Sequence, residues 1–242
     1  MRYIEKDKIT DVFSNGNLRK LRNYVNIQLS AQPDSLHPDY NGLNPVIRTD
    51  IINQLKLEQK GLCCYCLQRL VNSDTHIEHL APQSAFLNEE VNYYNIFLSC
   101  GSNKYQKKHC GHYKKEYTIP KVISYFNPKT HIKCQDLFKY NLLGEILPSD
   151  GFNSIKMNYE RYIDLNSHTK SLLATIDVLN LNCKELVSIR KGIIKGVVEL
   201  PDDKAKLEKT LSLLETPNYN TGYLDPFCEL TIFFLKDKIK KL

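Results

Sequence analysis

The chain has 242 residues, of which 42% are hydrophobic and 25% are charged, the ordinary composition of a soluble globular protein. No apolar run approaches the roughly 20 residues that a membrane-spanning helix needs. The formal net charge of +6 is too small to identify a nucleic-acid-binding protein by itself. Residues 1–6 resemble no secretory signal, so we expect a cytoplasmic protein with reduced cysteines and no membrane contact.

Two helices are predicted ahead of the first cysteine. Apolar residues at helical spacing predict a helix over Leu18–Leu29, and a segment rich in turn residues follows it. A second helix is predicted over Val46–Gln59, where Gly61 is placed to end it. This second helix leads the chain directly into Cys63.

A β-hairpin is predicted after the first cysteines. Leu67–Val71 and His76–Leu80 are strand-like, and a polar turn separates them. Adjacent strand residues point to opposite faces, so Glu78 and His79 can meet at one site only if the strand bends or ends there. Two further ordered segments are predicted after the hairpin, a short one over Asn92–Ser99 and a basic helix over 102–116.

The second half of the chain is predicted to be mainly helical. A hairpin is expected over Asp136–Leu147, and helices are expected from Ser167, from a capping box at Asn182–Glu185, from Pro201 and after Pro226. The apolar segment Phe227–Leu235 of the last helix either packs into the core or docks a partner. We therefore expect the α+β class, with segment 1–60 leading into a core at 61–118. The helical region 119–242 packs on that core as one unit and serves as a scaffold and partner-docking region.

Four cysteines are candidates for a structural zinc site. Cys63 and Cys66 have the spacing at which one Zn²⁺ binds two thiolates, and Cys100 with Cys110 is the best second pair. Four thiolates would leave no coordination position for a reacting water, so the role is structural. Cys64 is interpreted as a buried bystander. The three remaining cysteines are interpreted as small buried hydrophobic residues: Cys134, Cys183 and Cys228.

A second set of residues has the chemistry of phosphodiester hydrolysis. Such a reaction needs a base for water, which an imidazole supplies near neutral pH, and a cation for the scissile phosphate. We assign His79 as the general base, and Glu78 with His112 as ligands of Mg²⁺ or Mn²⁺. Asn95 is expected to hold the loop and to orient His79 by a hydrogen bond. His109 is the alternative to His112 as a metal ligand.

These two sets together resemble the HNH nucleases, whose core is a ββα-metal fold, and more closely the PtuB-type nucleases of Septu anti-phage systems, some of which are encoded with retrons. The resemblance covers roughly residues 47–195 and rests on Cys63–Cys66, His76–His79, Asn95–Cys100, Cys110–Lys114 and Thr175–Asn182. It implies a DNA-cleaving effector that works with a PtuA-type ATPase partner in defence against phage. One position departs from the pattern: many HNH proteins have Asn or His directly after the last cysteine, where this chain has Gly111.

A basic stretch over residues 104–115, on both sides of Cys110, is predicted to contact the nucleic-acid backbone. Five lysines fall within a dozen residues with only one opposing carboxylate, a density that suits a phosphate backbone. They are Lys104, Lys107, Lys108, Lys114 and Lys115.

Two other functions are compatible with parts of this pattern. A zinc-stabilised module that binds nucleic acid or protein without cutting it fits the wide cysteine spacing and Gly111. A redox protein that uses Cys63 and Cys66 would need a βαβ context, which this sequence does not predict.

Overall fold

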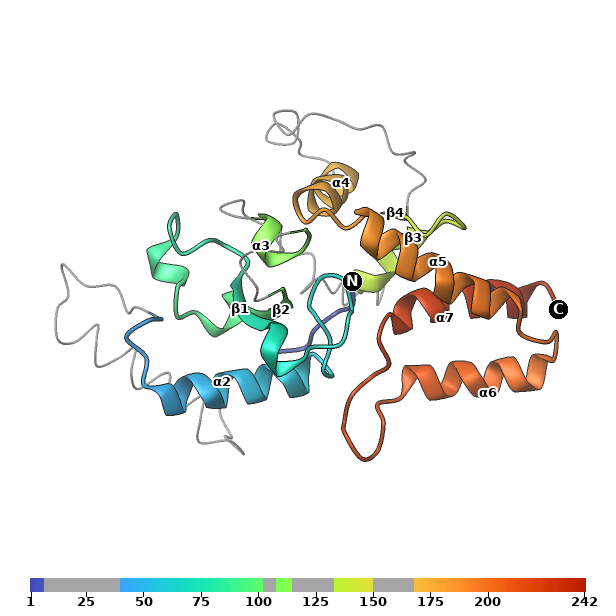
Figure 1. The fold of residues 1–242 in the computed structure, drawn as a ribbon, viewed down its shortest axis with the longest axis horizontal. Helices are drawn as coiled ribbons and strands as arrows, with labels where there is room; N and C mark the ends of the chain where they lie inside the picture. Colours follow the sequence, from blue (N-terminus) through green and yellow to red (C-terminus); the bar gives the residue numbers. More distant parts are fainter. Residues whose placement is uncertain (7–39, 102–107, 115–132, 150–167) are drawn as a thin grey trace.

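The computed structural model describes residues 1–6, 40–101, 108–114, 133–149 and 168–242. Its described elements are helices together with two small antiparallel sheets, β1–β2 and β3–β4 (Figure 1). The helices are α2 (Pro45–Glu58), α3 (Gly111–Lys114), α4 (His168–Val178), α5 (Lys184–Val198), α6 (Lys204–Glu215) and α7 (Cys228–Lys240), and the strands are β1 (Thr75–His79), β2 (Ile96–Cys100), β3 (Phe138–Tyr140) and β4 (Ile146–Pro148).

Helix α2 confirms the helix predicted ahead of the cysteines. Its first turn is capped by the Asn44 side chain, which accepts a hydrogen bond from the Val46 amide. Ile51 and Leu55, one turn apart, are its buried residues. The helix ends before Gly61, whose φ of +72° is a conformation that glycine adopts without strain. The other predicted N-terminal helix, Leu18–Leu29, lies outside the described residues.

The partner of strand β1 is β2, so the predicted hairpin between Leu67–Val71 and His76–Leu80 is wrong. Strand β1 pairs antiparallel with β2 in a register that places His76 opposite Ser99. Residues 67–71 contribute only an isolated bridge between Arg69 and Leu62. Because all five residues of β2 are buried, pairing with β2 places β1 against the core, which a local hairpin would not do.

A single buried glutamine joins α2 to this sheet. Gln59 donates from Nε2 to the carbonyls of Leu62 (2.8 Å) and Leu98 (2.9 Å), and its Oε1 accepts from the Leu98 amide (2.7 Å). The side chain thereby satisfies both backbone groups of Leu98 that face it. The end of α2, and with it the start of the cysteine segment, is fixed relative to β2.

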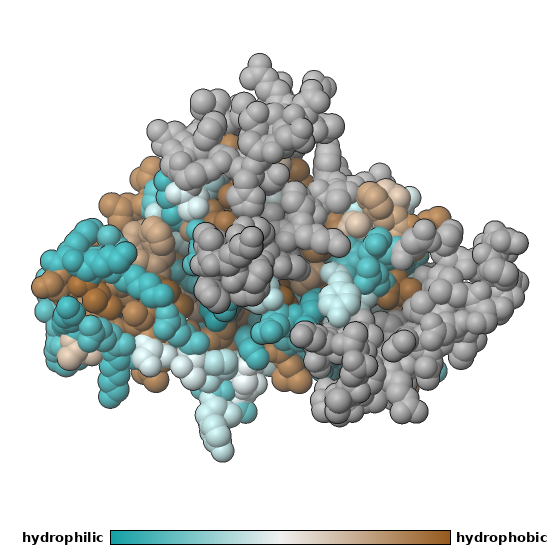
Figure 2. Space-filling view, turned by 180° about the vertical axis from the view of Figure 1, so that it is seen from behind, coloured by the Kyte–Doolittle hydropathy of each residue, from teal (hydrophilic) through white to brown (hydrophobic). Residues whose placement is uncertain are grey.

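The C-terminal region packs as helices beside the β3–β4 hairpin. The hairpin confirms the prediction for this segment, and its turn contains Gly144 at φ +81°. Helix α7 contacts both α5 and α6 (Figure 1). Leu230 and Leu235 of α7 are almost fully buried, which favours core packing for this helix. On the face of the molecule that points away from the viewer in Figure 1, polar and apolar residues of the described part are mixed (Figure 2).

The start of α5 differs from the predicted capping box. Cys183 is the N-cap residue and makes no side-chain capping bond. The Asn182 side chain instead bonds both backbone groups of Ile146 in β4, at 2.9 and 3.0 Å. A tertiary contact that satisfies two strand groups therefore replaces a local one. Ser167, the predicted start of α4, lies outside the described residues.

One hydrophobic core contains residues from all parts of the described chain. Its members include Met1 and Ile4 at the N-terminus, the apolar residues of β2, and residues of α4 to α7. Within the described ranges, no helix has both the length and the apolar character required to cross a membrane.

We expect Gln59→Ala to lower the free energy of unfolding by about 1–3 kcal/mol, because it leaves the buried amide of Leu98 without its partner. Urea unfolding measures this value. Gln54→Ala, on the partly exposed side of the same helix, is the matched control. Equal effects of the two substitutions would contradict the bridging role of Gln59.

Candidate functional site

Four buried thiols converge at the junction of α2, β2 and α3. The sulfur atoms of Cys63, Cys66, Cys100 and Cys110 all lie within 4.8 Å of one another. The Cys63–Cys110 pair is 3.9 Å apart and the Cys66–Cys100 pair 3.6 Å apart. Tetrahedral zinc with bonds of 2.3 Å places its sulfur ligands about 3.8 Å apart. The thiols therefore fit the geometry of a zinc site.

Two residues at this cluster have a left-handed backbone conformation. Leu67, directly after Cys66, has φ +65°, and Cys110 itself has φ +61°. The Cys110 amide donates to the carbonyl of Leu179, at 2.8 Å, just beyond α4. Because of this bond, the backbone of Cys110 is held by the C-terminal helical region, which is distant in sequence from all four cysteines.

The electrostatics of the cluster favour ionisation of Cys63. Burial opposes ionisation of Cys63, but hydrogen bonds from the neighbouring thiols, Cys100 first, outweigh it and hold its pKa well below the usual value. For Cys110, burial raises the pKa well above the usual value. A buried thiolate among other cysteine sulfurs is a donor set that a cation such as Zn²⁺ stabilises.

The remaining cysteines are not members of this group of four. Cys64 is buried but is not among the four grouped thiols, and burial raises the pKa of its thiol well above the usual value. Cys134, Cys183 and Cys228 are buried, as predicted. His109 lies beside the cluster, with its Nδ1 atom 3.1 Å from the Cys110 sulfur.

On one face of β1, Glu78 forms the centre of a second cluster. The residue is 5% exposed, and the Oε1 atom of its carboxylate accepts from the Tyr65 hydroxyl (2.9 Å) and pairs with the Lys114 ammonium (3.0 Å). Burial alone would raise its pKa, but His76, Lys114 and Tyr65 together outweigh burial and lower it. Glu78 is therefore an ionised carboxylate in the protein interior.

The second oxygen of Glu78 faces the imidazole of His76. His76 Nε2 lies 3.6 Å from Oε2, and the His76 ring stacks on His112 with centroids 4.1 Å apart and planes at 25°. Of the two rival histidines, His112 stacks on His76, and His109 lies beside the thiols. The sequence analysis missed His76, although the two-residue period of a strand places it on the same face as Glu78.

Gly111 has a steric reason to lack a side chain. A Cβ atom built there would lie 2.1 Å from Glu78 Oε2 and 2.7 Å from His76 Nε2. Any other residue would displace the carboxylate or the imidazole. The departure from the HNH pattern at this position therefore gives Glu78 and His76 their close approach to the backbone of α3.

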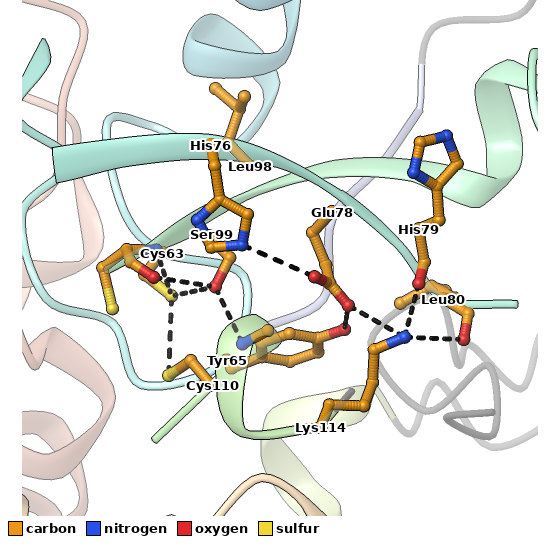
Figure 3. Close-up of polar contacts among 12 residues, drawn as sticks. Cys63, Tyr65, His76, Glu78, His79, Leu80, Leu98, Ser99, Cys110 and Lys114 are labelled. Atoms are coloured by element: carbon orange, nitrogen blue, oxygen red, sulfur yellow. Dashed lines mark hydrogen bonds and ion pairs between the residues drawn. The ribbon is translucent and has the colours of Figure 1, made fainter. Parts of the chain in front are cut away.

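His79 lies on the opposite face of β1 from Glu78 (Figure 3). Its Nε2 atom lies 2.8 Å from the carbonyl oxygen of Glu90, and Tyr40 packs edge-on against its ring at 5.7 Å between centroids. A carbonyl only accepts, so Nε2 carries the proton and Nδ1 keeps a lone pair. Burial lowers the pKa of His79 below 6.5 and favours this neutral form.

Asn95 fixes the loop after β1, but in a different way from the prediction. Its side chain bonds the Ala81 amide (2.8 Å), the Ala81 carbonyl (3.0 Å) and the Glu89 carbonyl (3.0 Å). The described contacts of Asn95 include none with the His79 ring. Asn95 instead holds Glu89, and the carbonyl of the next residue, Glu90, orients the His79 ring.

Lys114 also differs from the prediction of a nucleic-acid contact. It is 2% exposed, and besides Glu78 its ammonium bonds the carbonyls of His79 (2.6 Å) and Leu80 (3.4 Å; Figure 3). Its charge therefore faces the interior. Lys108 is exposed and pairs with Glu185 at 2.6 Å. The other three predicted contacts, Lys104, Lys107 and Lys115, lie outside the described residues.

No protein-family model matches the chain. The chain is 28% identical over 186 residues to a protein of Vibrio cholerae serotype O1 biovar El Tor that bears the name "Retron Vc95 putative HNH endonuclease". The match covers 74% of this chain and 79% of that protein.

We expect Cys110→Ser to reduce the zinc content and to lower the free energy of unfolding by about 4 kcal/mol or more, the range of metal-site losses. Zinc analysis by mass spectrometry and urea unfolding measure the two effects. Cys64→Ser is the matched control, because it alters a neighbouring buried thiol outside the group of four. Full zinc content in Cys110→Ser would contradict the site.

Proposed function

We propose that this chain is a metal-dependent HNH endonuclease that hydrolyses DNA phosphodiester bonds through a ββα-metal core formed by β1, β2 and α3. The observation that carries this proposal is the pair at the end of β1. Glu78 presents an ionised carboxylate beside the His76 imidazole, and its neighbour His79, the last residue of the strand, presents a neutral imidazole with a lone pair. Similarity to a protein with an HNH endonuclease name supports the same reaction.

Within this proposal, His79 is the general base. Neutral Nδ1 takes the proton of the attacking water, while the Glu90 carbonyl holds Nε2–H and fixes the ring. Glu78 and His112 hold Mg²⁺ or Mn²⁺, which supplies Lewis-acid stabilisation of the charge that develops on the phosphate and the leaving oxygen. Asn95 keeps the loop after β1 in place around the base.

The four thiols have a separate, structural role in this proposal. With zinc bound, they would hold the end of α2, the end of β2 and the start of α3 together. Gly111 and His112 directly follow Cys110, so the position of the proposed metal ligand depends on this zinc site. A site with four thiolates has no open position at which zinc could activate water.

We further propose a PtuB-type effector nuclease of a Septu or retron-associated defence system, acting in the bacterial cytoplasm with a PtuA-type ATPase partner. The residues that resemble this subfamily and the retron name of the similar protein support this assignment. The basic residues Lys104, Lys107, Lys108 and Lys115 are proposed to contact the DNA backbone. The C-terminal helices are the proposed scaffold for the partner.

The first test is plasmid cleavage by the purified protein with Mn²⁺ or Mg²⁺, with and without its partner. We expect His79→Ala to reduce cleavage by about 10²–10⁴-fold, the usual contribution of a general base, while DNA binding is retained. EDTA should abolish cleavage by the unmodified protein. Absence of cleavage in every condition, with DNA bound and zinc retained, would favour the binding-module alternative.

The pH dependence provides an independent check on the base. The pKa of His79 is lowered from the ordinary histidine value of 6.5. Its neutral form therefore persists down to pH 6.5 and is lost only below that pH. At saturating Mn²⁺, we expect kcat/KM to be constant near neutral pH and to decrease only below about pH 6.5. A decrease centred above this pH would indicate that another group is the base.

A further inference from the structure

We propose that Tyr40 and the carboxylate of Glu90 position the imidazole of His79, so that a residue ahead of α2 completes the active site. The inference rests on the proposed function for the role of His79 as the general base. It goes beyond that function, because neither residue is a predicted site residue. Tyr40 also lies outside the segment 61–118 that the sequence predicts as the nuclease core.

Two contacts hold the His79 ring, and they come from different parts of the chain. Glu90, in the loop after β1, offers its backbone carbonyl to Nε2 at 2.8 Å. Tyr40, ahead of α2, packs against the imidazole with the ring planes at 83° and the centroids 5.7 Å apart. This is the edge-to-face geometry that aromatic rings prefer. The carbonyl fixes the proton on Nε2, and the Tyr40 ring restrains the plane of the imidazole.

The carboxylate of Glu90 links these two contacts. Its Oε1 atom accepts a hydrogen bond from the Tyr40 amide (3.3 Å) and another from the side-chain amide of Gln83 (2.8 Å). Glu90 is 8% exposed, and a buried carboxylate is costly unless donors replace its water. Glu90 therefore joins the backbone of Tyr40 to the carbonyl that binds His79. The three residues form a closed set of contacts around the proposed base.

Helix α2 in turn holds Tyr40. The guanidinium of Arg48 lies over the Tyr40 ring, 5.6 Å from its centroid, within the range of a cation–π contact. Nε of Arg48 donates to the carbonyl of Leu43 at 3.0 Å, and the Leu43 amide donates to the carbonyl of Tyr40 at 3.1 Å. The turn that carries Tyr40 is thereby fixed on α2, and the position of the His79 ring depends on that helix.

These contacts determine which nitrogen of His79 can act as the base. Nε2 is engaged by the Glu90 carbonyl, so Nδ1 has the lone pair. A general base needs this lone pair within hydrogen-bond reach of the attacking water. A misplacement of about 1 Å can reduce a rate by about 10²-fold. Tyr40 and Glu90 are therefore expected to affect the chemical step more than the binding of DNA.

The first test is the tautomer of His79, measured by nitrogen nuclear magnetic resonance of the full chain at neutral pH. We expect the proton on Nε2 in the unmodified protein, and a mixture of the two neutral tautomers in Glu90→Ala and in Tyr40→Ala. Glu90→Gln and Tyr40→Phe should restore the single tautomer, because they keep the acceptor oxygen and the ring. Glu229→Ala, which removes another buried carboxylate in α7, is the matched control and should leave the tautomer unchanged.

Plasmid cleavage separates positioning from stability. We expect Glu90→Ala to reduce kcat by about 10²-fold with KM unchanged. The double variant with Tyr40→Ala should be no worse than the weaker of the two single variants, because both act through one ring. An unchanged tautomer or an unchanged kcat in Glu90→Ala would overturn the inference, and cleavage that is lost in His79→Ala would still support the nuclease. Conversely, a tautomer that depends on Glu90 in a protein without any cleavage would support the positioning of His79 and overturn the proposed function.

Discussion

The convergence of four cysteine sulfurs is the constraint on which the rest of the site depends. Cys63 and Cys66 follow α2, Cys100 ends β2 and Cys110 precedes α3, so the cluster joins three elements of the fold. Their sulfur atoms lie within 4.8 Å of one another. Because Gly111 and His112 directly follow Cys110, the position of this one cysteine decides where the helix residues meet β1.

Because the side chains of β1 alternate between its two faces, the proposed metal ligand Glu78 and the proposed base His79 point to opposite sides of the strand. His76 and Glu78 point to the side of α3, and His79 points to the loop that Asn95 and Glu90 hold. The ammonium of Lys114 contacts both sides, through the Glu78 carboxylate and the His79 carbonyl. This buried lysine therefore fixes the strand between the proposed metal ligand and the proposed base.

The Glu78 carboxylate remains ionised in the interior because several donors oppose the cost of burial. Removing a charge from water is expensive unless hydrogen bonds and an opposite charge replace the lost hydration. Tyr65 and Lys114 do this at Oε1. In the proposed nuclease, the catalytic ion would do the same at Oε2, so both oxygens of one buried carboxylate would have defined partners.

The sequence by itself was sufficient to predict helix α2, the β3–β4 hairpin and the choice of four cysteines, because these depend on local periodicity, turn residues and thiol spacing. It could not identify β2 as the partner of β1, because the two strands are separated by the loop 80–95 and their pairing depends on the burial of β2. It also could not reveal that Lys114 is buried, because this arises only when the cysteine cluster brings α3 against β1, a long-range contact that leaves no local sequence pattern. The placement of His76 beside Glu78, in contrast, follows from the two-residue period of β1 and could have been predicted.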